Sequence, residues 1–272
     1  MNALARHKKI IAKKIHWLKN CTFSLSRYSL YTHQPLEDMK NQNEPPISED
    51  QSIRSVANRQ LEAIENYAVE HSATIDRNTK TLLRELDRKT HLQVLLPQML
   101  SGNFQGEFLS FFATLLRPKR ILEIGTFTGY SAICFAQGLA DGGHLHTIEI
   151  NDELEPIIRE YLEKAGVENK VTLHIGNALE IIPSIEGTFD LVFIDADKLS
   201  YSKYYDMVIE RLNPRGLILI DNVLWSGKVL RDKKDKKTTV IHTLNQRIAA
   251  DERVINFLLP IRDGVMLVQR RG

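Results

Sequence analysis

Leu191-Val-Phe-Ile-Asp-Ala-Asp-Lys198 and Leu217-Ile-Leu-Ile-Asp-Asn222 are two short apolar runs that each end in oxygen-bearing side chains. Runs of this length and apolar character are typical of strands buried on both faces of a parallel sheet. In open α/β sheets, ligands bind at the carboxyl ends of such strands. We therefore predict two buried strands whose ends carry the polar groups of one site.

The sequence around these runs alternates between strand-like and helix-like segments. Helical periodicity over 152–165 and 201–212 separates the apolar runs, which predicts βαβ units and a doubly wound, mostly parallel sheet. The turn Pro260-Ile-Arg-Asp-Gly264 is short enough for a hairpin, so the last two strands should be antiparallel. The seven predicted strands are 120–125, 144–149, 171–175, 189–195, 217–221, 254–259 and 265–269.

Extra helices are predicted before the first strand. Helical periodicity covers 52–71, 76–91 and 104–116, with Ser52 and Asp76 as candidate N-caps of the first two. These helices and the α/β segment together form one predicted domain over 52–272. Residues 1–51 are predicted to be a basic N-terminal extension and linker, without stable structure.

Charge and cysteine content limit where the protein acts. The chain of 272 residues carries two cysteines that form no metal-binding or disulfide pattern, and no apolar run is long enough to cross a membrane. We expect a cytoplasmic protein without stable membrane insertion. Residues 1–36 contain seven Lys/Arg and no Asp/Glu. Three interpretations of this tail stay open: a transit peptide, a basic helix that contacts membrane or nucleic acid, or an extension upstream of a start at Met39.

The segment Ile121-Leu-Glu-Ile-Gly-Thr-Phe-Thr-Gly-Tyr-Ser131 joins the first strand to a helix. Gly125 permits a close approach of the backbone, and the helix N-terminus favours an anionic group. The Gly-x-x-x-Gly spacing differs from the dinucleotide fingerprint. Glu123 can accept from an ammonium group, and Glu149 ends the next strand where a ribose diol is usually held. Together these features favour S-adenosylmethionine as the ligand, although an ordinary strand-to-helix turn is the alternative.

The ends of the two opening runs offer a second set of groups. Asp195, Asp221 and Asn222 provide two carboxylates and an amide oxygen, which suit a divalent cation such as Mg²⁺, with Mn²⁺ or Ca²⁺ as alternatives. Lys198 follows at a distance that reaches the same crevice, and it is a candidate general base. The alternatives are carboxylates that only cap loops, and a surface lysine paired with Asp197.

Five segments together closely resemble the cation-dependent O-methyltransferases of the catechol and caffeoyl-CoA type, in particular their bacterial members. The similarity covers roughly residues 55–272. It implies the Rossmann-like fold of class I methyltransferases and methyl transfer from S-adenosylmethionine to a hydroxyl of a catechol-like vicinal diol. The segments are Leu122–Ser131, Thr147–Ile150, Phe193–Lys198, Ile220–Gly227 and Met99–Gly106, the last preceding the first strand.

The resemblance also assigns roles by position. It places Asp195, Asp221 and Asn222 on the cation and makes Lys198 the base. Asn177 stands where many bacterial relatives have Asp, which could alter a contact to adenine. Ala196-Asp197 replaces the His-Trp of the animal catechol enzymes, so substrate preference should differ. The implied cofactor contacts are Glu123, Gly125, Tyr130 and Ser131 around methionine, Met99 and Ser101 from the N-terminal side, Glu149 on the ribose, Ala178 and Ala196 at the adenine, and Asp195 where the cofactor and cation halves meet.

Two other functions remain open from the sequence. Some bacterial members of the resembled family methylate a wobble 5-hydroxyuridine of tRNA, and the run Arg231-Asp-Lys-Lys-Asp-Lys-Lys237 could meet phosphates, or could simply be a solvated loop. A non-catalytic cofactor-binding protein recruited by its basic tail is the other. The resemblance further implies a homodimer and a small phenolic substrate as partners.

Overall fold

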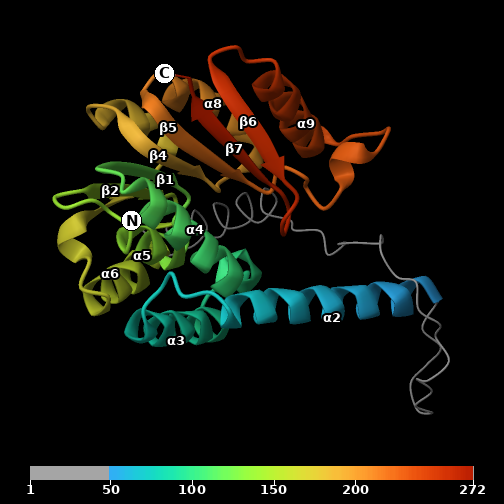
Figure 1. Ribbon diagram of the computed structural model, residues 1–272, viewed down its shortest axis with the longest axis horizontal. Coiled ribbons are helices and arrows are strands. Elements are labelled where there is room, and N and C mark those ends of the chain that lie inside the picture. The colour runs from blue at the N-terminus through green and yellow to red at the C-terminus, as the bar shows by residue number, and fades with distance from the viewer. Residues whose placement is uncertain (1–48, 272) are drawn as a thin grey trace, which may run out of the picture.

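The computed structural model describes residues 49–271, with side chains from Arg59 onward. Within this range seven strands form one sheet in the order β3-β2-β1-β4-β5-β7-β6 (Figure 1). Neighbouring strands from β3 to β5 are parallel, and β7 is antiparallel to both of its neighbours. The strands are β1 (Arg120–Ile124), β2 (His144–Glu149), β3 (Val171–Ile175), β4 (Phe189–Ile194), β5 (Leu212–Asp221), β6 (Val254–Leu259) and β7 (Val265–Arg270).

Helices cover both faces of this sheet. One layer contains α3, α4, α5 and α6, and the opposite layer contains α7, α8 and α9, while α2 extends outward beside α3 and α4 (Figure 1). The helices are α2 (Glu49–Glu70), α3 (Arg77–Gln93), α4 (Gly102–Leu116), α5 (Tyr130–Ala136), α6 (Glu155–Lys164), α7 (Ala178–Ile181), α8 (Tyr201–Ile209) and α9 (Lys236–Ala249).

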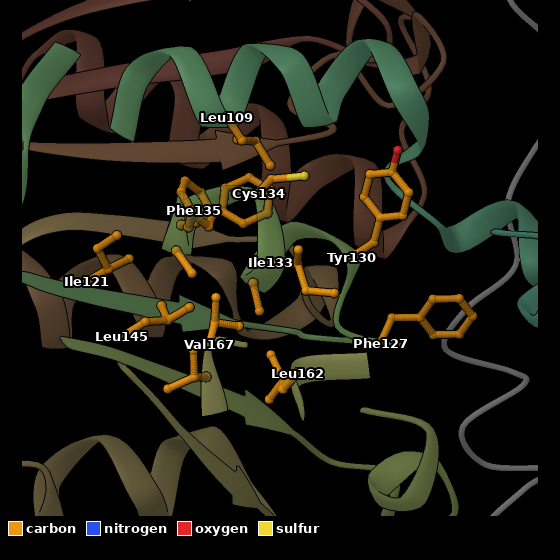
Figure 2. Packing of buried hydrophobic residues seen from close by; sticks show 14 of the residues in the cluster. Leu109, Ile121, Phe127, Tyr130, Ile133, Cys134, Phe135, Leu145, Leu162 and Val167 are labelled. Carbon is orange, nitrogen blue, oxygen red and sulfur yellow. The ribbon is translucent and has the colours of Figure 1, made fainter. Parts of the chain in front are cut away.

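Two separate hydrophobic cores hold the layers together. Because side chains alternate across a strand, Ile121 and Leu145 face the α5 layer, whereas Leu122 and Ile148 face the α8 layer. Figure 2 shows the first core, in which Leu109 of α4 packs over the α5 side chains. Burial of such side chains from water is the main stabilising contribution to the sheet.

The strand order reverses between β1 and β4, and this reversal positions the site. Pairing of Ile124 with Ile194 puts the ends of the two strands at the same level, and the chains then diverge toward opposite helix layers. The backbone N–H of Asp195 still donates to the carbonyl of Ile124 at 2.9 Å beyond the last paired residues. In sheets of this kind the crevice for ligands opens where the order reverses.

The predicted fold class is confirmed, with differences at element ends. Asp76 caps α3 as expected, because its carboxylate accepts from the backbone N–H of Asn78 and Thr79. The Ser52 prediction was wrong, since α2 already runs from Glu49. Strand β5 begins at Leu212 rather than at residue 217, because its first residues pair with β4 across an irregularity in the register.

The remaining differences concern the C-terminal part and the tail. Helix α9 begins at the end of the basic run 231–237, where the side chain of Asp235 accepts from the backbone N–H of Thr238 at 2.8 Å. The hairpin is present as predicted, and its second strand lies between β5 and β6. Among the helices of residues 49–271, none is both long and apolar enough for a membrane span. The predictions for residues 1–48 lie outside the described residues.

Candidate active site

The loop after β1 is held against the end of β4. Gly125 has φ +99°, and a Cβ atom on it would lie 2.0 Å from the carbonyl oxygen of Asp195. Its backbone N–H donates to the carbonyl of Ile148 at 2.9 Å, which ties the loop to β2 as well. The sequence attributed this glycine to the approach of a ligand. In the structure, the backbone of Asp195 by itself already excludes a side chain here.

Glu123 lies fully buried at the end of β1 beneath this loop. Burial raises the pKa of its carboxyl from 4.5 to about 7, although hydrogen bonds from Ser131 and Thr147 lower it in part. The nearby carboxylates of Asp195 and Glu149 raise it further. A buried carboxylate with this surplus of negative charge around it is well suited to pair with a cationic group.

Glu149 ends β2 and closes the other side of the loop. Its carboxylate accepts from the backbone N–H of Phe127 at 2.7 Å and from that of Asn151 at 2.9 Å. Burial nevertheless raises its pKa from 4.5 to about 7. A cavity of about 350 Å³ has Phe127, Asn151 and Ile157 in its walls, and the Glu149 carboxylate holds the backbone of the first two. The predicted ribose-binding group thus fixes two residues of a cavity wall.

The other predicted cofactor contacts lie at the start of helices. Tyr130 and Ser131 begin α5 and are buried, and the Tyr130 hydroxyl donates to Asn103 Oδ1 of α4 at 2.9 Å. Ser101 is buried directly before α4, and Met99 ends the short helical turn η1 (Pro97–Met99) that packs against the core. The N-terminal ends of α4 and α5 are therefore in contact.

Ala178 and Ala196 follow β3 and β4 respectively. Both pack against the core under the α8 layer, and Ala178 begins α7. Asn177 caps α7, since its Oδ1 accepts from the backbone N–H of Leu179 at 3.0 Å. Its side chain thus has a local structural role, whatever it contributes to a ligand.

Asp195, Asp221 and Asn222 come together from the ends of β4 and β5. Asp221 and Asn222 are buried, whereas Asp195 is partly exposed. Burial and the neighbouring Asp195 carboxylate raise the pKa of Asp221. The two carboxylates therefore repel each other when no cation lies between them. The Asn222 Oδ1 atom is buried and has no hydrogen-bond partner among the described residues. An orphaned buried acceptor beside two carboxylates fits a hard divalent cation.

The candidate cation site depends on that amide oxygen. No group of three or more His, Cys, Asp or Glu side chains within residues 49–271 is arranged to hold a metal ion. Two carboxylates alone leave a small cation with few protein ligands, which is the usual situation for Mg²⁺, since it keeps several waters or substrate oxygens.

Lys198 is buried and binds Asp195, not Asp197. Its Nζ donates to Asp195 Oδ1 at 2.9 Å and to the hydroxyl of Tyr201. Asp197 instead accepts from the backbone N–H of Ser200 and from the hydroxyl of Tyr204, which caps the turn before α8. The alternative of a surface lysine paired with Asp197 is therefore wrong.

Two site residues were missed from the sequence. The Tyr201 hydroxyl donates to the backbone carbonyl of Asp221 at 3.1 Å, and Gln105 Nε2 donates to Asp221 Oδ2 at 3.0 Å. The position of Tyr201, three residues after Lys198 at a helix start, was a usable signal. Gln105 lies on α4 and is 116 residues away from Asp221, so no local pattern indicates it.

Comparison with known proteins agrees with the fold. Residues 69–271 match the model of a family described as O-methyltransferase. A probable caffeoyl-CoA O-methyltransferase 2 from Dictyostelium discoideum is 32% identical over 215 residues, covering 76% of this chain and 91% of that protein. Catechol O-methyltransferase domain-containing protein 1 from Mus musculus is 37% identical over 169 residues, covering 60% of this chain and 64% of that protein.

A solved structure shows the same architecture with a ligand. The O-methyltransferase TomG from Streptomyces achromogenes, involved in tomaymycin synthesis and determined in complex with SAM, superimposes with a TM-score of 0.70 at 28% identity. The match covers 77% of this chain and 96% of that one. The family match spans well over half of the chain, and it confirms the resemblance drawn from the sequence motifs. This chain belongs to the O-methyltransferase family that includes the caffeoyl-CoA and catechol enzymes.

Proposed function

We propose that this protein transfers the methyl group of S-adenosylmethionine to one hydroxyl of a catechol-like small molecule, with a divalent cation at Asp195, Asp221 and Asn222. The observation that carries the proposal is the double role of Asp195. Its backbone packs on Gly125 of the loop that we assign to the cofactor, while its side chain binds Lys198 in the cation half. A methyl donor and an acceptor held in these two halves would be neighbours.

The cofactor half offers a complementary group for each polar part of the donor. Glu123 would receive the ammonium of the methionine part, whose positive charge relieves the cost of burying that carboxylate. Glu149 would accept from the ribose hydroxyls. Gly125, Tyr130 and Ser131, with Met99 and Ser101 from the α4 side, would surround the methionine part, and Ala178 and Ala196 would flank the adenine.

The cation half would orient the acceptor. When bound, a divalent cation would chelate the two adjacent oxygens of the acceptor and make its hydroxyl more acidic. The carboxylates of Asp195 and Asp221 and the unpartnered Oδ1 of Asn222 would hold it. Asp195 is the most exposed of the three, so this side of the site faces the approaching acceptor.

Lys198 would receive the proton of the acceptor. Its Nζ directs two N–H groups to Asp195 Oδ1 and to the Tyr201 hydroxyl, whose own proton is donated to the Asp221 carbonyl. Three of the four tetrahedral directions around this nitrogen are taken by its own carbon chain and the two contacts, and one direction remains. When the lysine is neutral, its lone pair lies along this remaining direction and would accept the proton.

The reaction then needs one displacement. The acceptor hydroxyl gives its proton to Lys198 Nζ, its oxygen forms a bond to the methyl carbon, and the bond between that carbon and the sulfonium sulfur breaks. Neutral S-adenosylhomocysteine leaves with the electron pair. Because charge is neutralised in this step, the protein contributes mainly by holding the oxygen, carbon and sulfur in line.

Methyl transfer from labelled S-adenosylmethionine tests the proposal. Catechol-like phenols and undermethylated tRNA are offered separately, each with Mg²⁺ and with EDTA, to the wild type, Asp221→Ala and Asp206→Ala. Asp206 is the matched control because its carboxylate is exposed on α8 and pairs with Arg247 on α9. We expect labelled phenol with Mg²⁺, loss of label with EDTA and with Asp221→Ala, and full activity of Asp206→Ala.

Other results would contradict specific parts of the proposal. Activity that persists in EDTA and in Asp221→Ala would rule out the cation. Label in tRNA alone would replace the phenolic acceptor with a nucleoside. Binding of S-adenosylmethionine without transfer to either acceptor would contradict the proposed acceptor class.

A further inference from the structure

Gln105 is a buried polar residue that the proposed reaction does not use. It lies on α4, is 2% exposed, and donates from Nε2 to Oδ2 of Asp221 at 3.0 Å. A buried amide without a partner is energetically costly, so this contact stabilises both side chains. It is also a direct link between the N-terminal helices and the end of β5.

The hydrogen bond from Gln105 fixes the Asp221 carboxylate together with a backbone donor. The backbone N–H of Asn222 donates to Oδ1 at 2.8 Å, while Gln105 donates to Oδ2. With one donor on each oxygen, rotation of the carboxylate about its Cβ–Cγ bond would break at least one contact. Each carboxylate oxygen has a second lone pair, which a cation could use.

Close packing of α4 on α5 places Gln105 in this position. The next residue, Gly106, has no side chain, and a Cβ atom there would lie 2.8 Å from the ring of Tyr130 and 3.0 Å from Cys134 Sγ. At Gly106, α4 and α5 therefore lie too close together to leave room for a side chain. Gln105 is held by a rigid helix interface and not by a loop, which is the condition for an oriented hydrogen bond.

We propose that Gln105 is a positioning residue that orients the Asp221 carboxylate for the divalent cation. The inference rests on the proposed cation site and names the residue that organises it. Glutamine suits the role because it donates a hydrogen bond without adding charge next to Asp195 and Asp221. Partners of this kind behind a metal ligand typically change metal affinity by about 10- to 100-fold.

Direct binding of Mn²⁺, without any acceptor present, tests this role. Mn²⁺ is titrated into the full-length wild type, Gln105→Met and Ser110→Ala, and the free ion is measured by electron paramagnetic resonance. Methionine has a similar length but cannot donate a hydrogen bond. Ser110 is the control because it lies on the same helix, is fully buried, and donates to the Thr74 carbonyl instead of to Asp221.

We expect Gln105→Met to raise the Kd for Mn²⁺ by roughly 10-fold or more. The Kd for S-adenosylmethionine, measured by calorimetry, should change by less than about two-fold, and Ser110→Ala should change neither constant. Gln105→Leu is the second variant if the methionine variant does not fold. A raised Kd for Mn²⁺ with an unchanged Kd for S-adenosylmethionine indicates that Gln105 positions Asp221. A general loosening of α4 would instead raise both constants.

The failures of the two proposals are distinguishable. An unchanged Mn²⁺ affinity in a folded Gln105 variant, or an equal loss in Ser110→Ala, would overturn the role of Gln105 and leave the cation site intact. A wild type that does not bind Mn²⁺, or an Asp221→Ala variant that binds it normally, would overturn the proposed cation site itself.

Discussion

The carbonyl oxygen of Asp195 lies 2.0 Å from the position that a Cβ atom on Gly125 would occupy. This contact is between two backbones, at the point where β1 and β4 diverge, and it brings the cofactor loop and the cation half into direct contact. No flexible side chain can move away to relieve it. Glycine at position 125 is therefore a requirement of the fold itself.

Gly125→Ala should destabilise the protein strongly. Alanine would both clash with the Asp195 backbone and adopt φ +99°, which L-residues rarely do. We expect the free energy of unfolding in urea to fall by about 2 kcal/mol or more. Gly142→Ala is the control, because Gly142 also has positive φ but its Cβ would meet nothing within 4 Å. Equal losses in both variants would show that the Asp195 contact does not matter.

Lys198→Met should remove most of the catalytic activity. The variant keeps the apolar stem but has no group to accept the proton, and general-base catalysis typically contributes 10²- to 10⁴-fold. We expect kcat to fall by about that factor, with the affinity for S-adenosylmethionine nearly unchanged. Lys203→Met, which alters an exposed lysine on α8 just after the turn that carries Lys198, should retain full activity. A kcat within a few-fold of the wild type would exclude Lys198 as the base.

Tyr201→Phe should lower kcat without affecting the fold. The ring is retained, but the hydroxyl that accepts from Lys198 and donates to the Asp221 carbonyl is lost. Lys198 would become charged when it accepts the proton, and a hydrogen bond to a charged group contributes about 1.5 to 3 kcal/mol, so we expect a loss of roughly 10- to 100-fold. Tyr204→Phe loses a hydroxyl that binds Asp197 instead and is the matched control. If both variants lower kcat equally, the role of Tyr201 is not specific.

Glu123→Gln should stabilise the ligand-free protein at high pH. The pKa of Glu123 is raised from 4.5 to about 7, so between these values the folded protein keeps a proton that the unfolded chain releases. The contribution of Glu123 to the free energy of unfolding therefore falls as the pH rises through this window, by up to about 3 kcal/mol in total. Glutamine removes this dependence.

Melting temperatures at pH 5 and pH 8, chosen as roughly the lower and upper sides of this window, test the Glu123 prediction. At the higher pH, Glu123→Gln should melt several degrees above the wild type, and at the lower pH the difference should be much smaller. The same variant should bind S-adenosylmethionine more weakly, because a neutral amide cannot balance an ammonium group. A difference in melting temperature that does not vary with pH would contradict the raised pKa.

Much of the architecture was predictable from local patterns. An apolar run that ends in an acidic residue indicates a buried strand. Strands of a parallel sheet are covered on both faces, so their polar residues lie at the strand ends. Asp195, Asp221 and Asn222 follow from this rule, as do Glu123 and Glu149. Element ends were less predictable. The start of β5 depends on pairing with β4, which is a contact between distant segments.

The sequence by itself determined the succession of strands and helices along the chain, the family, and the residues at the strand ends. These depend on periodicity and on short motifs. Only the tertiary structure decided which partner each side chain has. Lys198 turns to Asp195 and Tyr201, and Gln105 reaches Asp221 from a helix 116 residues earlier. Such contacts arise from the packing of helices on the sheet, where each position is set by the combined shape of many side chains.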